Sequence, residues 1–250
     1  VLFPPDPLPP ESGRLTDSGK VLNKTSIGMA LLETPGVWLG SLAARLSGAP
    51  QDGVSLPYQV AVCGSLMMFY AAGWLLLYLA WLRLGVPPNR AFPIWLGLLG
   101  ATNLLHYAVK EPAMTHAASV AVTALLLYLV SGWQTGATRM LGRGIAAGAV
   151  LGLLVLIRTA NLAIVPFLVA LLIGRRVVNG RVVAGMALGA LLLVGLQVAA
   201  TYALWGRLGY AIYPDESFAN DWRGVWLGLV SHRHGLFAHH PWYLVLLVVN

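Results

Sequence analysis

The chain has 250 residues, of which 58% are hydrophobic and only 10% carry a charge. Soluble domains average roughly 45–50% apolar and about 25% charged residues, so a water-soluble fold is excluded, because it could not bury this much apolar surface. Disorder is excluded because disordered chains are polar. The net charge of +7 flanks apolar runs and forms no basic face, so we expect no nucleic-acid partner. The composition predicts an integral protein of a lipid bilayer.

Residues 1–59 form the first segment, which we expect to be an extracytoplasmic loop. It opens Pro-rich, and apolar residues then recur from Thr25 to Leu46. This spacing predicts one or two helices lying in the membrane interface, broken at Pro35. Because the chain begins without Met and ends inside an apolar run, we also expect an internal segment of a longer protein.

A membrane-spanning helix needs about 20 apolar residues. The candidate spans that precede residue 206 are 60–82, 91–109, 113–133, 145–157, 162–174 and 182–205. The fourth and fifth are short and are separated by residues 158–161, where we expect a re-entrant hairpin or two short helices that meet. One long kinked helix is the alternative. Residues 60–205 are thus predicted to be an all-α transmembrane bundle, 206–241 a second extracytoplasmic loop, and 242–250 the start of a further span.

The charges between the candidate spans predict the orientation of the bundle. The connections after the first, third and fifth spans contain basic residues and no acidic one, namely Arg83, Arg90, Arg139, Arg143, Arg175, Arg176 and Arg181. All nine acidic residues fall on the other side. Cytoplasmic connections carry an excess of Lys and Arg. Any chemistry is therefore expected at the extracytoplasmic face.

A first polar cluster joins the second and third spans at that face. It consists of Lys110, Glu111, Pro112 and His116. Pro112 suits the first turn of a helix, and a carboxylate beside a helix start is favoured by the helix dipole. Ionisable groups this close to hydrocarbon are costly and usually functional. The alternative is a Lys–Glu pair that caps a turn.

Arg158 and Asn161 interrupt apolar sequence at the same face. A guanidinium there needs an anion, either a carboxylate or a lipid phosphate. The alternative is an ordinary loop arginine at the level of the lipid headgroups.

The segment 206–241 carries the densest group of polar residues. Arg233 and His234 are candidates to contact an anionic substrate, and a zinc-like site built from histidines is less favoured. The candidate carboxylates of this segment are Asp215, Glu216 and Asp221. Each is either a site residue or a solvated loop residue.

Several segments, in this order, resemble one family. They are GKVLNKTSIG at 19–28, EPAMTHA at 111–117, LIRTAN at 156–161 and SHRHGLF at 231–237. Together they resemble bacterial polytopic membrane enzymes of the GT-C glycosyltransferase superfamily, which includes protein O-mannosyltransferases and the lipid A aminoarabinose transferase.

The resemblance implies a many-helix enzyme of the bacterial inner membrane. Such enzymes transfer a sugar from a polyprenyl-phosphate donor to a glycan, lipid or protein acceptor, with inversion at the anomeric carbon. The residues that could bind the donor phosphate are Lys24, Lys110, Arg158 and Arg233. Glu111, His116 and Asn161 are expected to line the site, and the first two could hold a divalent metal ion. The family's acidic base lies after the first span, which places it upstream of Val1.

Two other functions stay open. A transporter or flippase for a lipid-linked or anionic amphipathic substrate would need charges in mid-span and helices broken at the bilayer centre. A non-catalytic subunit would keep the fold without a working site.

Overall fold

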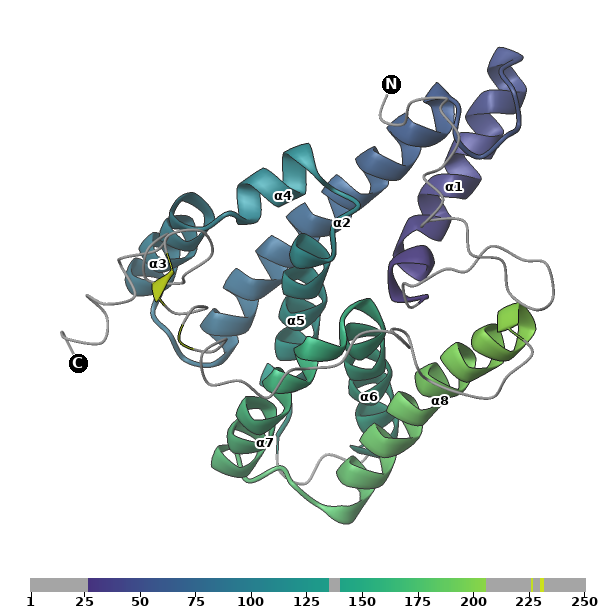
Figure 1. The fold of residues 1–250 in the computed structure, drawn as a ribbon. Coiled ribbons are helices and arrows are strands. Elements are labelled where there is room, and N and C mark those ends of the chain that lie inside the picture. Colours follow the sequence, from purple (N-terminus) through teal and green to yellow (C-terminus); the bar gives the residue numbers. More distant parts are fainter. Residues whose placement is uncertain (1–26, 135–139, 206–225, 227–229, 232–250) are drawn as a thin grey trace. The chain divides into compact units, whose positions relative to one another are not determined.

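A computed structural model describes residues 27–134, 140–205, 226 and 230–231. The chain divides into two compact units, residues 1–210 and 211–250, and the helices described below belong to the first. Six predicted site residues lie outside the described part: Lys24, Asp215, Glu216, Asp221, Arg233 and His234. The described elements are all helical (Figure 1), which confirms the all-α class for this part of the chain.

The elements follow one another through short connections (Figure 1). They are α1 (Gly28–Ser47), α2 (Leu56–Arg83), α3 (Pro88–Ala101), α4 (Leu104–Lys110), α5 (Thr115–Ser131), α6 (Met140–Ile157), the 3₁₀ helix η1 (Thr159–Ala163), α7 (Ile164–Gly174) and α8 (Gly180–Trp205). Among them, α2, α6 and α8 are long and apolar enough to cross a membrane. The pair α3 and α4, bent by 59° at its break, could form a fourth span.

These apolar helices suggest a membrane protein, as the composition predicts. Only 17% of the most apolar window of α2 and 22% of that of α8 are buried inside the protein. A water-soluble helix buries one apolar stripe against the core of its own protein. In contrast, α2 and α8 leave most of their apolar side chains on the surface of the protein, where lipid can contact them. The predicted span 145–157 was too short, because α6 already begins at Met140. Conversely, α5 and α7 are shorter apolar helices. The domain boundaries stay predictions.

The predicted break at Pro35 is wrong, because α1 is one helix with Pro35 inside it. A proline costs a helix interior about 3 kcal/mol, since it lacks an N–H and crowds the preceding turn. Packing along α2 offsets this cost. Met29 shares a buried cluster with Tyr70 of α2, and Gly40 lies against Tyr58 further along. The two helices are therefore antiparallel and in contact over most of α1.

The turn between α1 and α2 is held by Asp52. Its Oδ1 accepts hydrogen bonds from the backbone N–H groups of Val54, at 2.9 Å, and Ser55, at 2.7 Å. These two bonds hold the pKa of the Asp52 carboxyl below its usual value. They also hold in place the two residues that lead into α2, of which Ser55 is the N-cap.

We expect acid to loosen this turn. A depressed folded-state pKa adds stability that is fully present above the unfolded value, about 3.9, and is lost as the pH falls through the folded value. Amide hydrogen exchange at Val54 and Ser55 should therefore accelerate, relative to intrinsic rates, only in that acidic range. Asp52→Ala should give the fast exchange already at neutral pH. Equal protection in Asp52→Ala and the parent protein would contradict this role.

The closest helix pair is α6 with α8, which lie side by side (Figure 1). Gly144, Gly148 and Gly152 repeat every fourth residue on α6, and Gly185 and Gly189 do so on α8. A Cβ atom at Gly148 would lie 2.1 Å from the Met186 carbonyl oxygen, and one at Gly189 would lie 2.1 Å from that of Ile145. Small residues at this spacing let two backbones approach closely in apolar surroundings. The contacts advance together along both helices, so α6 and α8 run parallel.

Between these two parallel helices the chain must reverse, and it does so at Arg158. Arg158 is extended, with φ −159° and ψ 125°, and ends α6. One long kinked helix is therefore excluded. The chain forms two helices that meet here, but only α7 is short, because α6 has 18 residues. The helix α7 begins a few residues after Arg158. Just after its other end, Arg175 donates a hydrogen bond to the carbonyl oxygen of Trp133, which follows α5. Thus α7 returns along the bundle.

The described bundle consequently has two distinct ends. At the arginine end, defined by Arg83, Tyr128, Trp133 and Arg175, the Arg83 guanidinium lies 3.7 Å from the centroid of the Tyr128 ring and donates to its hydroxyl at 2.5 Å. The histidine end is defined by Pro112, His116 and Arg158. Arg83 and Arg175 come from connections that the charge pattern assigned to one side, and the fold places both at the arginine end.

Candidate functional site

The histidine end brings together residues that are far apart in sequence. His116 stands in the first turn of α5, and Arg158 follows the last residue of α6. The Nη1 atom of Arg158 lies 3.3 Å from Nδ1 of His116. Two of the predicted site residues are therefore direct neighbours, although 42 residues separate them in the chain.

This contact favours one tautomer of the imidazole. A guanidinium has donors only, so a hydrogen bond between these two atoms requires Nδ1 of His116 to accept, and the proton of a neutral ring then stands on Nε2. The ring is half-buried and stacks on Tyr107, with centroids 4.5 Å apart and planes inclined by 29°. Tyr107 thus fixes the ring plane while Arg158 fixes the tautomer. A neutral imidazole whose Nε2–H is not used by Arg158 can donate to a ligand oxygen.

Asn161 holds the turn after Arg158 in place. Its Nδ2 donates to Ser119 Oγ at 2.9 Å and to the Leu154 carbonyl oxygen at 2.8 Å. The amide therefore links η1 to α5 and to the last turn of α6. Both contacts use the N–H groups of the Asn161 side chain and fix the turn that follows Arg158. Within the described structure, Asn161 therefore positions Arg158.

Arg158 itself has a largely free guanidinium. The residue is exposed, and its described side-chain contact is the one with His116. A cation held at a fixed place, with donors left over, is suited to a phosphate or carboxylate ligand.

Lys110 and Glu111 lie in the chain between Tyr107, which stacks on His116, and His116 itself. They join the end of α4 to the turn before α5, and both are exposed. The buried Pro112 anchors this turn, because its carbonyl oxygen accepts a hydrogen bond from the Tyr70 hydroxyl of α2. Glu111 and Arg158 are the charged groups that act on the His116 imidazole. The turn therefore adds one cation and one carboxylate to the histidine end.

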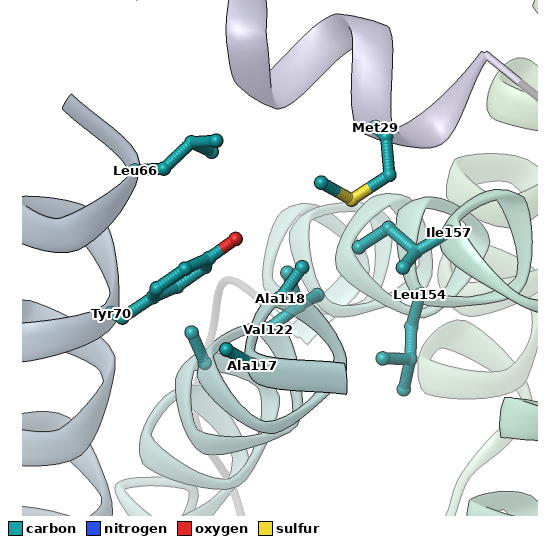
Figure 2. Packing of buried hydrophobic residues seen from close by; sticks show 9 residues of the cluster. Met29, Leu66, Tyr70, Ala117, Ala118, Val122, Leu154 and Ile157 are labelled. Atoms are coloured by element: carbon teal, nitrogen blue, oxygen red, sulfur yellow. The ribbon is translucent and has the colours of Figure 1, made fainter. Parts of the chain in front are cut away.

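Beneath these polar groups lies a buried apolar cluster (Figure 2). Tyr70 points from α2 toward Ala118 of α5 and Met29 of α1, and Met29 lies beside Ile157 of α6. The start of α1 is tied down further by its backbone, since the N–H of Ile27 donates to Gln197 Oε1 of α8 at 3.0 Å. Residues of four helices thus pack together in the cluster that contains Ile157, the neighbour of Arg158 in the chain.

Glu33 is a carboxylate that the sequence pattern did not single out. It stands on α1, one turn after Met29, and is half-buried. Burial raises the pKa of its carboxyl above the ordinary value. Its charge acts on the Tyr70 hydroxyl, which places it near the Pro112 turn. A half-buried carboxylate with a raised pKa is a candidate general base.

The described residues contain no group of three or more His, Cys, Asp or Glu side chains close enough to hold a metal ion. Glu111 and His116, the pair suggested for a divalent ion, would therefore need ligands from elsewhere.

No family model matches the chain. Comparisons with curated proteins and with solved structures likewise find no match.

The fold brings several of the predicted site residues together. The described candidates Lys110, Glu111, His116, Arg158 and Asn161 all lie at the histidine end. Sequence reasoning missed Glu33, Tyr70, Tyr107 and Ser119. One signal was available for Glu33, namely an acidic residue inside an apolar helical pattern, whereas the other three look like ordinary helix residues.

Proposed function

We propose that this chain belongs to a membrane glycosyltransferase that moves a sugar from a polyprenyl-phosphate donor to an acceptor at the extracytoplasmic face. The observation that carries the proposal is the Arg158–His116 pair, in which an exposed guanidinium and an imidazole are held together at one end of an apolar bundle. The order of motifs that resembles GT-C enzymes supports the same activity.

The chemistry of the reaction fits these residues. An acceptor hydroxyl attacks the anomeric carbon, the bond from that carbon to the phosphate oxygen breaks, and polyprenyl phosphate leaves with the bonding electron pair. The developing negative charge on the phosphate needs fixed donors, for which Arg158, Lys110 and the Nε2–H of His116 are available. The attacking hydroxyl must lose its proton to a base. The resemblance places the family's acidic base upstream of Val1, and among the described residues Glu33 is the acid that could take this role.

A donor-transfer assay tests the proposal. The purified protein is reconstituted in proteoliposomes with a polyprenyl-phosphate sugar labelled in the sugar, and transfer of the label from the lipid is followed for glycan, lipid and protein acceptors. Release of sugar-free polyprenyl phosphate that depends on an acceptor is the expected result. Intact donor with every acceptor class would contradict the proposal.

The Glu33→Gln variant tests the base. Glutamine keeps the size of the side chain but cannot take a proton, so we expect the rate of transfer to fall by about 10²–10⁴-fold, the usual contribution of a general base. The parent protein should lose activity as the pH falls through the raised pKa of Glu33, because only the ionised carboxylate accepts a proton, and the variant should lack this acidic limb. Unchanged rates in a folded Glu33→Gln protein would assign the base elsewhere.

One observation favours a second function. The apolar pair α3 and α4 is bent by 59° at a break of a few residues, and broken helices occur in transporters. A flippase would move a fluorescent lipid-linked substrate between leaflets without chemical change. Fluorescence that becomes inaccessible to a membrane-impermeant quencher, with intact donor, would favour the flippase over the transferase.

A further inference from the structure

We propose that the arginine end of the bundle binds the phosphate groups of anionic phospholipids in the membrane leaflet that it faces. The binding surface is a group of five described arginines, which we call the arginine patch: Arg83, Arg143, Arg175, Arg176 and Arg181. The inference rests on the membrane location of the bundle and does not depend on the proposed transfer of a sugar.

Two arginines of the patch lie at the end of α5. Arg83, the last residue of α2, donates to the carbonyl oxygen of Tyr128 at 3.3 Å. Arg175, which follows α7, donates to the carbonyl oxygen of Trp133 at 3.4 Å. Because Tyr128 stands in the last turn of α5 and Trp133 follows that helix, both guanidinium groups lie at its C-terminal end. The negative end of the helix dipole favours cations there.

The starts of α6 and α8 add two further arginines. These starts lie side by side, since a Cβ atom at Gly144 would lie 2.8 Å from the carbonyl oxygen of Val182. Arg143 directly precedes Gly144, and Arg181 directly precedes Val182. Val182 and Trp133 belong to one buried cluster, which joins these helix starts to the chain that follows α5. The fold thus gathers arginines that three separate connections supply.

Arg176 adds a fifth charge in a backbone conformation that favours glycine. Its φ is 55°, in the left-handed region that is costly for a residue with a Cβ atom. The turn is fixed on both sides, because the Arg176 N–H donates to the Ile173 carbonyl oxygen at 2.8 Å and Val177 is buried. Glycine would form this turn without strain, whereas arginine gives it an exposed guanidinium.

The arginine patch has no acidic partner within the described part of the chain. Glu111 is the one acidic residue between Asp52 and Asp215 in the sequence, and it lies at the histidine end. Neither α6 nor α8 has an acidic residue in its first turn, although the helix dipole disfavours the arginines that stand there. Phosphate groups would neutralise charges that the described protein leaves unbalanced.

The guanidinium groups keep donors for such a ligand. Each guanidinium has five N–H donors, of which Arg83 uses its two Nη atoms and Arg175 its Nη2 for the bonds to α5 and Trp133. The buried Nε of Arg175 has no hydrogen-bond partner among the described residues. Arg143, Arg176 and Arg181 are exposed. Planar guanidinium groups with free donors are well suited to phosphate oxygens.

The apolar side chains beside the patch favour a lipid over a free anion. Those that directly precede or follow a helix end here include Leu141, Ile173, Val178 and Val183, which are between 46% and 60% exposed. Both α2 and α8, which carry arginines of the patch, are long and apolar enough to cross a membrane. Acyl chains can therefore contact apolar side chains while the phosphate meets the guanidinium groups. Basic clusters at the ends of membrane helices bind anionic headgroups in this way.

Two exposed arginines of the patch provide the test. Arg143→Gln and Arg181→Gln remove charge without breaking the hydrogen bonds of Arg83 and Arg175. Arg45→Gln is the matched control, because Arg45 is an exposed arginine in the last turn of α1. Binding of dioleoyl phosphatidylglycerol to the full detergent-solubilised chain is measured by native mass spectrometry. Dioleoyl phosphatidylcholine, with the same acyl chains and no net charge, is measured in parallel, and circular dichroism monitors folding.

Phosphatidylglycerol should bind more tightly than phosphatidylcholine. Arg181→Gln should weaken its binding about fivefold and the double glutamine variant about 10–30-fold, from the usual contribution of one arginine near an anionic headgroup. Arg45→Gln should bind like the parent protein. The double lysine variant at positions 143 and 181 should recover most of the lost affinity, because it restores both charges.

Three results would overturn the proposal. The first is equal binding of the two phospholipids by the parent protein. The second is a loss of phosphatidylglycerol binding in Arg45→Gln as large as that in Arg181→Gln, which would indicate an effect of net charge alone. The third is displacement of phosphatidylglycerol by an equimolar amount of inorganic phosphate, which would indicate a site for a free anion. None of these measurements requires sugar transfer, so the transferase can fail while the lipid site stands.

Discussion

Replacing Gly148 with leucine should unfold the α6–α8 pair or prevent it from forming. The Cβ atom alone would lie 2.1 Å from the carbonyl oxygen of Met186 and 2.6 Å from its Cα atom. These are backbone atoms, so no side-chain rotation can relieve the clash, and the helices must separate. Separation would remove the close contact on which apolar helices depend, since no hydrophobic force drives them together within lipid.

Gly148→Ala is the milder variant and should be destabilised by about 1–3 kcal/mol, the usual cost of overpacking. At about 2–4 °C per kcal/mol for a chain of this length, the loss is measurable by thermal unfolding in detergent. Gly142→Ala provides the control, because a Cβ atom at Gly142, on the same helix, would meet no other atom within 4 Å. Alanine there should be neutral or slightly stabilising, since it is the better helix former. Equal stability of the two alanine variants would contradict the packing described for α6 and α8.

Removing the guanidinium of Arg158 should weaken use of the lipid-linked donor by about 10–100-fold. A hydrogen bond to a charged group contributes about 1.5–3 kcal/mol, and Arg158 is held ready to donate by the turn that Asn161 anchors. If Arg158 binds the donor phosphate in the ground state, Arg158→Ala should mainly raise KM. If it acts on the departing phosphate, kcat should fall instead.

Arg158→Lys should recover only part of the lost function, because an ammonium group cannot donate in the planar two-fold manner of a guanidinium. Arg90→Ala is the matched control, an exposed arginine near the start of α3, in a connection predicted to lie on the cytoplasmic side. It should leave donor kinetics unchanged. Parent-like KM and kcat in a folded Arg158→Ala protein would remove Arg158 from the site and, with it, the main support for the proposed function.

Local sequence was sufficient for the features that depend on composition and on single residues. The apolar runs predicted the helices, because a chain with so few charges has to place apolar side chains against lipid or against itself. The four residues from Arg158 to Asn161 predicted the reversal between α6 and α7, since polar groups and an exposed backbone are costly inside an apolar phase. The distribution of arginines predicted which helix ends lie together.

Tertiary packing decided which helices contact one another. These contacts depend on the surfaces of both helices, which the sequence of one helix does not describe. Pro35 remains inside α1 only because α2 supports that helix along its length, so local propensity gave the wrong result there. The glycine repeat of α6 has meaning only opposite the glycines of α8.

The site itself is also a product of packing. His116 and Arg158 were each visible as polar residues near a helix end, but their contact required α5 and α6 to meet at the same depth. Glu33 gained its half-buried surroundings only when α1 docked against α2 and α6. The sequence by itself therefore determined that this protein is helical and bound for a membrane, and where its polar residues interrupt the apolar runs. The tertiary structure decided which of those residues meet, because the close approach of helices depends on side chains from both partners.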